Sequence, residues 1–131
     1  MVSLGRSQVL SVHSLIDNLM VRRPSPAVYL SADLDAFLKR LDPQSKFKKW
    51  LIDMEKVLKE NMYSGELIKK NQIPPDYIKR YGVNNLYRYA HHEGYRSCYT
   101  ILNVKGVGVC PFVLDLLSHE QYDKIFHYRK R

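Results

Sequence analysis

The sequence predicts an α+β fold in which a small antiparallel sheet of about four strands carries a helical pair on one face. Two consecutive segments have apolar residues at helical spacing, and aromatic and β-branched residues dominate later segments. The chain has 131 residues and is 45% hydrophobic, enough for one domain with a core. We expect one strand, two helices, a basic linker, a three-stranded meander and a short helix, in that order.

Residues 1–25 are predicted to form an N-terminal helical extension, and residues 26–131 the main domain. The extension carries apolar residues at helical spacing, namely Val9, Val12, Leu15, Ile16, Leu19 and Met20. Two interpretations have equal support. Either this helix docks on the domain that follows it, or it is an arm that binds a partner or forms a homodimer through residues 1–25.

The first predicted strand, residues 27–31, precedes two amphipathic helices. Ser31 is suited to cap the first helix, and acidic residues follow in its first turn. The second helix runs from about Pro43 to Met62, with an apolar stripe on one side and lysines over much of the rest. As an antiparallel pair, the two helices can cover one face of a sheet.

Residues 65–85 form a connector in which the helical periodicity is broken. Pro74 and Pro75 cannot continue a helix, although residues 77–81 are suited to one helical turn that ends at Gly82. Long loops in compact domains are often functional. The connector is therefore a candidate for contact with a substrate or partner through four basic residues, Lys69, Lys70, Lys79 and Arg80.

A β-hairpin that combines basic and aromatic side chains is predicted next, with Glu93-Gly94 as its turn. Its register has two alternatives. A two-residue turn places Arg88 and Arg96 on opposite faces of the sheet, whereas a three-residue loop from His91 to Glu93 places them on the same face. The choice decides whether the two arginines can act together.

A strand over residues 109–117 and a short helix capped by Ser118 complete the domain. The chain is basic, with 21 Lys and Arg against 13 Asp and Glu and a formal net charge of +8. This excess fits either a solvated basic surface or a polyanionic partner such as nucleic acid, a ribosome or an acidic protein.

The two cysteines, Cys98 and Cys110, are too few for a disulfide framework. The start of the chain does not read as a signal peptide, so we expect a cytoplasmic protein with free thiols. No apolar run reaches the roughly 18 residues of a membrane span, and we expect no membrane partner. No cofactor or metal is expected, because neither cysteine has a partner at the spacing of zinc ligands.

Three motifs resemble the RelE/ParE toxin superfamily, in the same order and spacing. They lie in residues 28–31 with 35–41, in residues 86–89 with 94–101, and in residues 114–119 with 122–126. The resemblance covers residues 27–128 and implies a RelE-like fold. It further implies a toxin of a type II toxin–antitoxin system, with an antitoxin protein, mRNA and the ribosome as partners.

The resemblance implies a ribosome-associated endoribonuclease that cleaves mRNA by metal-independent acid/base chemistry. Such chemistry needs a base, a cation at the phosphate and an acid. Arg96 and Arg88 match the family's hairpin cations, and His119 is suited to act as base or acid. Further RNA contacts are expected from Lys69, Lys70, Lys79, Arg80, His91, His92, Tyr95 and Arg129.

Two departures from the family pattern support the first of two alternative functions, and the second alternative is implied by the range of functions in the superfamily. Ala90 and Glu120 stand where active members carry basic residues. The first alternative is therefore a catalytically degenerate module of the same fold that binds RNA or protein. The second alternative is a ParE-type gyrase inhibitor.

Overall fold

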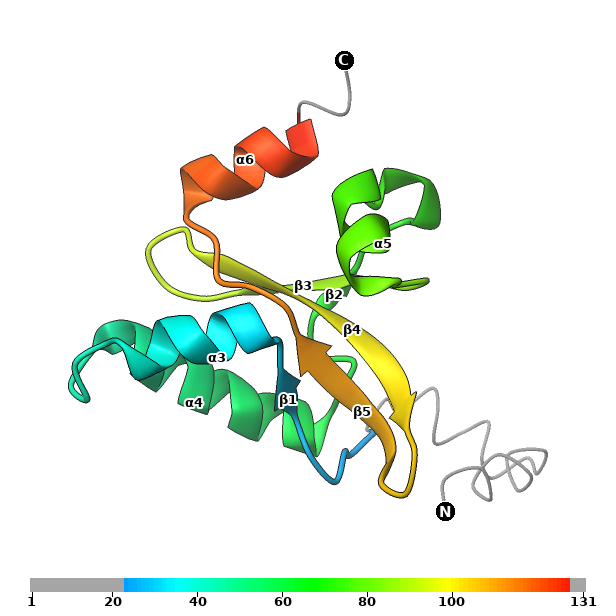
Figure 1. The fold of residues 1–131 in the computed structure, drawn as a ribbon, viewed down its shortest axis with the longest axis horizontal. Helices are drawn as coiled ribbons and strands as arrows, with labels where there is room; N and C mark the ends of the chain where they lie inside the picture. Colours follow the sequence, from blue (N-terminus) through cyan, green and yellow to red (C-terminus); the bar gives the residue numbers. More distant parts are fainter. Residues whose placement is uncertain (1–22, 128–131) are drawn as a thin grey trace.

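The computed structural model describes residues 23–127, and its fold is α+β (Figure 1). The predicted N-terminal extension therefore lies outside the described residues, apart from its last three. In chain order the elements are β1 (Tyr29–Leu30), α3 (Ala32–Lys39), α4 (Lys46–Glu60), β2 (Glu66–Leu67), the 3₁₀ helix η1 (Lys70–Gln72), α5 (Pro75–Tyr81), β3 (Tyr87–Ala90), β4 (Arg96–Val104), β5 (Gly108–Val113) and α6 (His119–His127).

The strands form one five-stranded mixed sheet in the order β1-β5-β4-β3-β2. Neighbours from β5 to β2 are antiparallel, but β1 runs parallel to β5, with Tyr29 opposite Phe112. The prediction of an antiparallel sheet of about four strands is therefore wrong in two details: the sheet has five strands, and one of its pairs is parallel. A parallel pair needs a long connection, and nearly the whole domain connects β1 to β5.

The predicted helical pair covers one face of the sheet, where α3 and α4 pack against β4 and β5 (Figure 1). Trp50, Met54 and Leu58 of α4 meet Tyr99 and Val113 of the sheet in this core. Four residues of the α4 stripe, Trp50, Leu51, Met54 and Leu58, are buried and most of its lysines are exposed, which is why the helix docks in one orientation.

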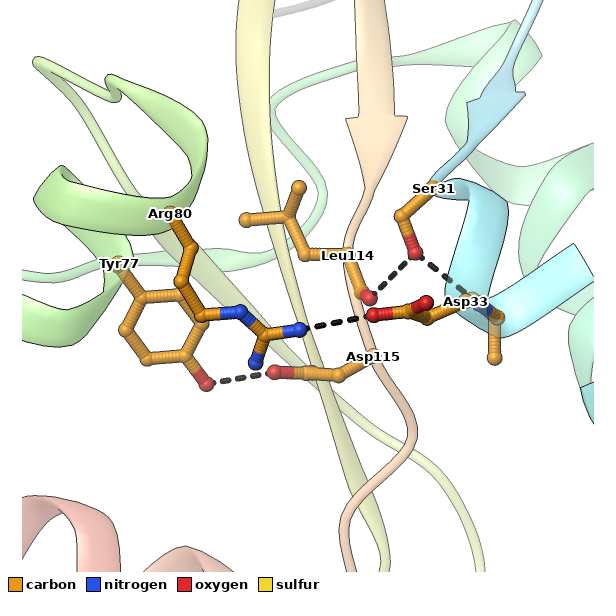
Figure 2. Close-up of polar contacts among 7 residues, drawn as sticks. Ser31, Asp33, Tyr77, Arg80, Leu114 and Asp115 are labelled. Atoms are coloured by element: carbon orange, nitrogen blue, oxygen red, sulfur yellow. Dashed lines mark hydrogen bonds and ion pairs between the residues drawn. The ribbon is translucent and has the colours of Figure 1, made fainter.

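Ser31 caps α3 as predicted. Its Oγ accepts a hydrogen bond from the Leu34 backbone N at 3.1 Å and donates one to the Leu114 carbonyl at 2.8 Å (Figure 2). The second helix begins at Lys46, later than the predicted Pro43, because the Ser45 hydroxyl accepts from the Phe47 backbone N at 3.1 Å and caps it there.

The opposite face of the sheet is covered by α5 and α6 (Figure 1). The predicted helical turn at 77–81 is part of α5, which ends at Gly82 in a left-handed conformation with φ 64°. Beneath α5, the Asp115 carboxylate accepts from the Tyr77 hydroxyl at 2.5 Å and from the Cys98 backbone N at 2.8 Å. Burial raises the pKa of Asp115 to about 6.

The hairpin between β3 and β4 has a three-residue loop, residues 92–94, because the His91 backbone N donates to the Tyr95 carbonyl at 2.8 Å and extends the pairing by one step. In this loop φ is 58° at Glu93 and 80° at Gly94. Ala90 pairs with Arg96, so the loop starts one residue later than in the three-residue alternative. Because Arg88 pairs with Cys98, and Arg96 lies two residues from Cys98 on the same strand, Arg88 and Arg96 still share one face, as that alternative predicts. This is the face that α5 and α6 cover.

Cys98 and Cys110 are buried in the sheet as free thiols. Across residues 23–127, no helix combines the length and apolar character needed to cross a membrane.

Candidate functional site

A cavity of about 740 Å³ lies beside β2 and β3, between these strands, the end of α4 and the start of α6. It brings together the three predicted catalytic residues, Arg88, Arg96 and His119, from three different elements. The other lining residues are Val57, Ser64, Gly65, Glu66, Tyr89, Ala90, Tyr122 and Asp123.

Arg88, in β3, is held from two sides. Its Nε donates to Glu66 Oε1 at 2.9 Å, and its Nη1 donates to the Tyr122 hydroxyl. These hydrogen bonds, the one to Glu66 foremost, raise the pKa of Arg88, which stays charged. Gly65 lets β2 approach this closely, since a Cβ there would lie 2.7 Å from the Arg88 carbonyl oxygen.

Arg96, at the start of β4, has weaker partners. Its Nη1 lies 3.4 Å from the Gly94 carbonyl oxygen, and its Cζ lies 4.9 Å from the centroid of the Tyr122 ring. No carboxylate of residues 23–127 forms an ion pair with it. Within the described part of the chain, Arg96 is therefore the cation of the cavity with the fewest acidic partners.

His119 opens α6 at the mouth of the cavity and is largely exposed, at 63% of its side chain. Its Nε2 lies 3.2 Å from Asp123 Oδ2, one helical turn later. The hairpin loop packs against it, because a Cβ on Gly94 would lie 3.2 Å from the His119 Cβ. Ser118 caps this helix as predicted, accepting from the Gln121 backbone N at 3.2 Å.

The two partners that hold Arg88 in the cavity, Glu66 and Tyr122, were missed by sequence reasoning, as was Asp123, which pairs with His119. Glu66 is on β2, a two-residue strand inside the connector, where no periodic pattern marks it. The hydrogen bond from Arg88 lowers the pKa of Glu66 and keeps it ionised. Tyr122 was expected only on the apolar side of α6, and its ring does stack on Phe126 with 4.3 Å between centroids. The Arg88 contact of its hydroxyl has no sequence signal.

Three predicted RNA-binding residues lie on the other face of the sheet, against α4. The rings of His91, His92 and Tyr95 all pack on Trp50, with centroid distances of 6.0, 5.6 and 5.5 Å. His91 Nε2 also hydrogen-bonds Ser97 Oγ at 2.8 Å, and burial lowers the pKa of His91 to about 4. The structure does not bring these residues to the cavity, because their rings pack against α4 on the opposite face of the sheet from Arg88 and Arg96.

The basic residues of the connector also lie outside the cavity. Lys69 precedes η1 and Lys70 opens it, while Lys79 is on α5. Arg80 Nη2 is 2.8 Å from Asp33 Oδ2 and links α5 to α3 across the end of β5 (Figure 2). Arg129 lies outside the described residues.

The cavity holds the groups needed for anion binding and proton transfer. Two guanidinium groups, two carboxylates and an imidazole line it, contributed by Arg88, Arg96, Glu66, Asp123 and His119. Of the two departures from the family pattern, Ala90 lines the wall without a charge and Glu120 is exposed on α6. Among residues 23–127, no group of three His, Cys, Asp or Glu side chains is placed to hold a metal ion.

No model of a known protein family, no curated protein and no solved structure matches this chain.

Proposed function

We propose that the protein is a RelE-like toxin, an endoribonuclease that cleaves ribosome-associated mRNA and that an antitoxin neutralises. The observation that carries this proposal is the meeting of Arg96, Arg88 and His119 in one cavity, with Arg96 left without a carboxylate partner among the described residues. A planar guanidinium in such a place is suited to bind a phosphate through two parallel hydrogen bonds.

The cleavage step assigns one task to each group. A base removes the proton of the ribose 2′-hydroxyl, the 2′-oxygen attacks phosphorus, and the bond from phosphorus to the 5′-oxygen breaks. The products are a 2′,3′-cyclic phosphate and a 5′-hydroxyl. Glu66, the carboxylate paired with Arg88, is assigned as the base, and His119, beside Asp123, is assigned as the acid that donates a proton to the leaving 5′-oxygen.

The arginines stabilise the charge that develops on the phosphate. Arg88 is fixed by Glu66 and Tyr122 before any ligand arrives, so it needs little reorganisation. Arg96 lies on the same face, two residues nearer the loop end of the hairpin, and supplies the second cation.

A second candidate function is a module of this fold that binds RNA without cleaving it. Ala90 leaves one wall of the cavity uncharged, and Glu66 neutralises part of the Arg88 charge. Such a protein would keep the phosphate contact of Arg96 and lack the full transition-state stabilisation.

The test is expression of the wild-type chain, of Arg96→Gln and of the matched control Lys49→Gln, which removes the same charge from an exposed position on α4. Growth and mRNA integrity are followed, the latter by primer extension. The toxin proposal expects growth arrest with cut mRNA in the wild type and control, and relief by Arg96→Gln.

Intact mRNA together with salt-sensitive RNA binding by the purified protein would assign the non-cleaving function instead. Growth arrest that Arg96→Gln does not relieve would contradict both functions for this cavity. In that case a supercoiling assay separates gyrase inhibition from the remaining causes.

A further inference from the structure

An apolar groove lies away from the cavity, between β1, α3 and α4. Its volume is about 310 Å³, and its walls are mainly apolar, formed by Val28, Leu30, Leu38, Leu51, Ile52 and Val113. Ile52 is 52% exposed although it stands beside a core residue of α4, Leu51. Lys48 and Glu55 form a charged rim. An apolar groove with a polar rim is the usual form of a docking site for an amphipathic helix.

The described chain enters the domain next to this groove. The Arg23 backbone N donates to Asn61 Oδ1 at 3.2 Å, and the Met62 backbone N donates to the Arg23 carbonyl at 2.8 Å. Two residues later, the Ser25 backbone N donates to the Lys59 carbonyl at 2.8 Å. These bonds fix the end of the preceding segment beside the C-terminal end of α4, and the chain then passes along the groove wall as β1.

The segment before Arg23 has the pattern and length to fill the groove. Its sequence predicts an amphipathic helix, with the apolar stripe running from Val9 to Met20. At 1.5 Å per residue, a helix over residues 9–20 is about 18 Å long, as is the part of α4 from Lys48 to Lys59. A helix that turns back at residues 21–23 would therefore lie along α4 and reach the far end of the groove.

We propose that residues 9–20 dock as an amphipathic helix in the groove of their own chain and cover Ile52. Burial of apolar side chains from both sides drives the contact. The short tether at Arg23 favours this intramolecular contact over binding to a second copy, because it holds the segment at a high effective concentration. The proposal is independent of the catalytic function proposed for the cavity.

The test compares the reactivity of single cysteines introduced into the full chain. Ile52→Cys reports on the groove, and Ile78→Cys on α5 is the matched control, since the two isoleucines are 52% and 50% exposed in the described structure. The native thiols are buried and react slowly with an exposed-thiol reagent. We expect the cysteine at 52 to react on the order of tenfold more slowly than that at 78, which corresponds to a groove covered about 90% of the time.

A second substitution assigns the cover to residues 9–20. Ile16→Asp, within the apolar stripe, should restore fast labelling at 52, whereas Ser14→Asp, outside it, should not. Equal labelling rates at 52 and 78 would overturn the proposal. Protection of position 52 that disappears on dilution would also overturn it, because it would show that a second copy of the chain occupies the groove.

Discussion

The guanidinium of Arg96 lies over the ring of Tyr122, with 4.9 Å from Cζ to the ring centroid, while the hydroxyl of the same tyrosine accepts a hydrogen bond from Arg88. One side chain of α6 therefore holds both hairpin arginines. The spacing of the two cations depends on how α6 docks on the sheet, and α6 docks by burying Tyr122 and Phe126 in the core that contains Cys98 of β4.

The first prediction separates the two roles of Tyr122. Tyr122→Phe keeps the ring in the core and removes the hydroxyl that fixes Arg88. We expect the free energy of unfolding to fall by about 1.5–3 kcal/mol, the usual contribution of a hydrogen bond to a charged group, and RNA binding to weaken. Urea unfolding and fluorescence anisotropy with a short RNA measure the two effects.

Tyr63→Phe is the control for this change, because Tyr63 is 40% exposed and lies on the other side of β3, where it packs against Tyr87. It should alter stability by less than about 0.5 kcal/mol. If Tyr122→Phe has no larger effect than the control, the hydroxyl of Tyr122 does not hold Arg88.

The second prediction concerns the salt dependence of RNA binding. If Arg96 contacts a phosphate, Arg96→Gln should weaken RNA binding for all sequences and lower the slope of log K against log salt by about one. Anisotropy titrations at several salt concentrations give this slope. Lys49→Gln makes the same change of charge on the outer face of α4, and it should leave the slope nearly unchanged.

The third prediction is a substitution that tightens RNA binding instead of weakening it. Glu66 occupies the Nε side of Arg88, so a phosphate that binds there must compete with a carboxylate. Glu66→Gln removes the negative charge and should tighten RNA binding several-fold, while RNA cleavage falls if Glu66 is the base.

Glu55→Gln is the matched control for Glu66→Gln, since Glu55 also pairs with a cation, Lys59, but lies outside the cavity. Its RNA affinity should equal that of the wild type. Weaker binding by Glu66→Gln than by this control would show that Glu66 supports the phosphate site rather than competing for it.

The sequence predicted the elements of the fold better than their pairing. The caps at Ser31 and Ser118 and the apolar stripe of the second helix are local signals, and each is confirmed. The parallel pairing of β1 with β5 joins segments from the two ends of the domain. A two-residue strand such as β1 is too short for its side-chain pattern to predict which strand it pairs with.

The site was predicted in part for the same reason. Arg88, Arg96 and His119 do line one cavity. Whether the two arginines share a face depends on the length of the hairpin loop, and the sequence is compatible with a loop of two or of three residues. Glu66 reaches the cavity only through the β2–β3 pairing. Conversely, His91 has the residue type of a catalytic group, and its location against Trp50 became visible only with the tertiary structure.

The fourth prediction is a pH dependence of stability that comes from Asp115. Burial raises its pKa from the ordinary 3.8 to about 6 in the folded protein. A carboxyl with a raised pKa stabilises the fold while it is protonated, so its contribution is present below pH 4 and is lost as the pH rises to about 6. At about 1.4 kcal/mol per pH unit, the loss is on the order of 3 kcal/mol.

His91 acts in the opposite direction, because burial lowers its pKa to about 4 and its contribution is lost as the pH falls. The two groups partly cancel in the wild type, so the prediction is stated as a difference. The free energy of unfolding of the wild type minus that of Asp115→Asn should decrease as the pH rises from 4 to 7, because His91 is common to both proteins.

Urea unfolding at several pH values measures this difference, and the slope is informative even if Asp115→Asn is less stable throughout. Asn accepts the Tyr77 hydrogen bond through its oxygen, but its amide nitrogen cannot accept the one from the Cys98 backbone, so some loss is expected at every pH. Asp53→Asn, at an exposed position of α4, makes the same chemical change outside the core. A pH-independent difference for Asp115→Asn, or one no steeper than that for Asp53→Asn, would show that Asp115 is not protonated on folding.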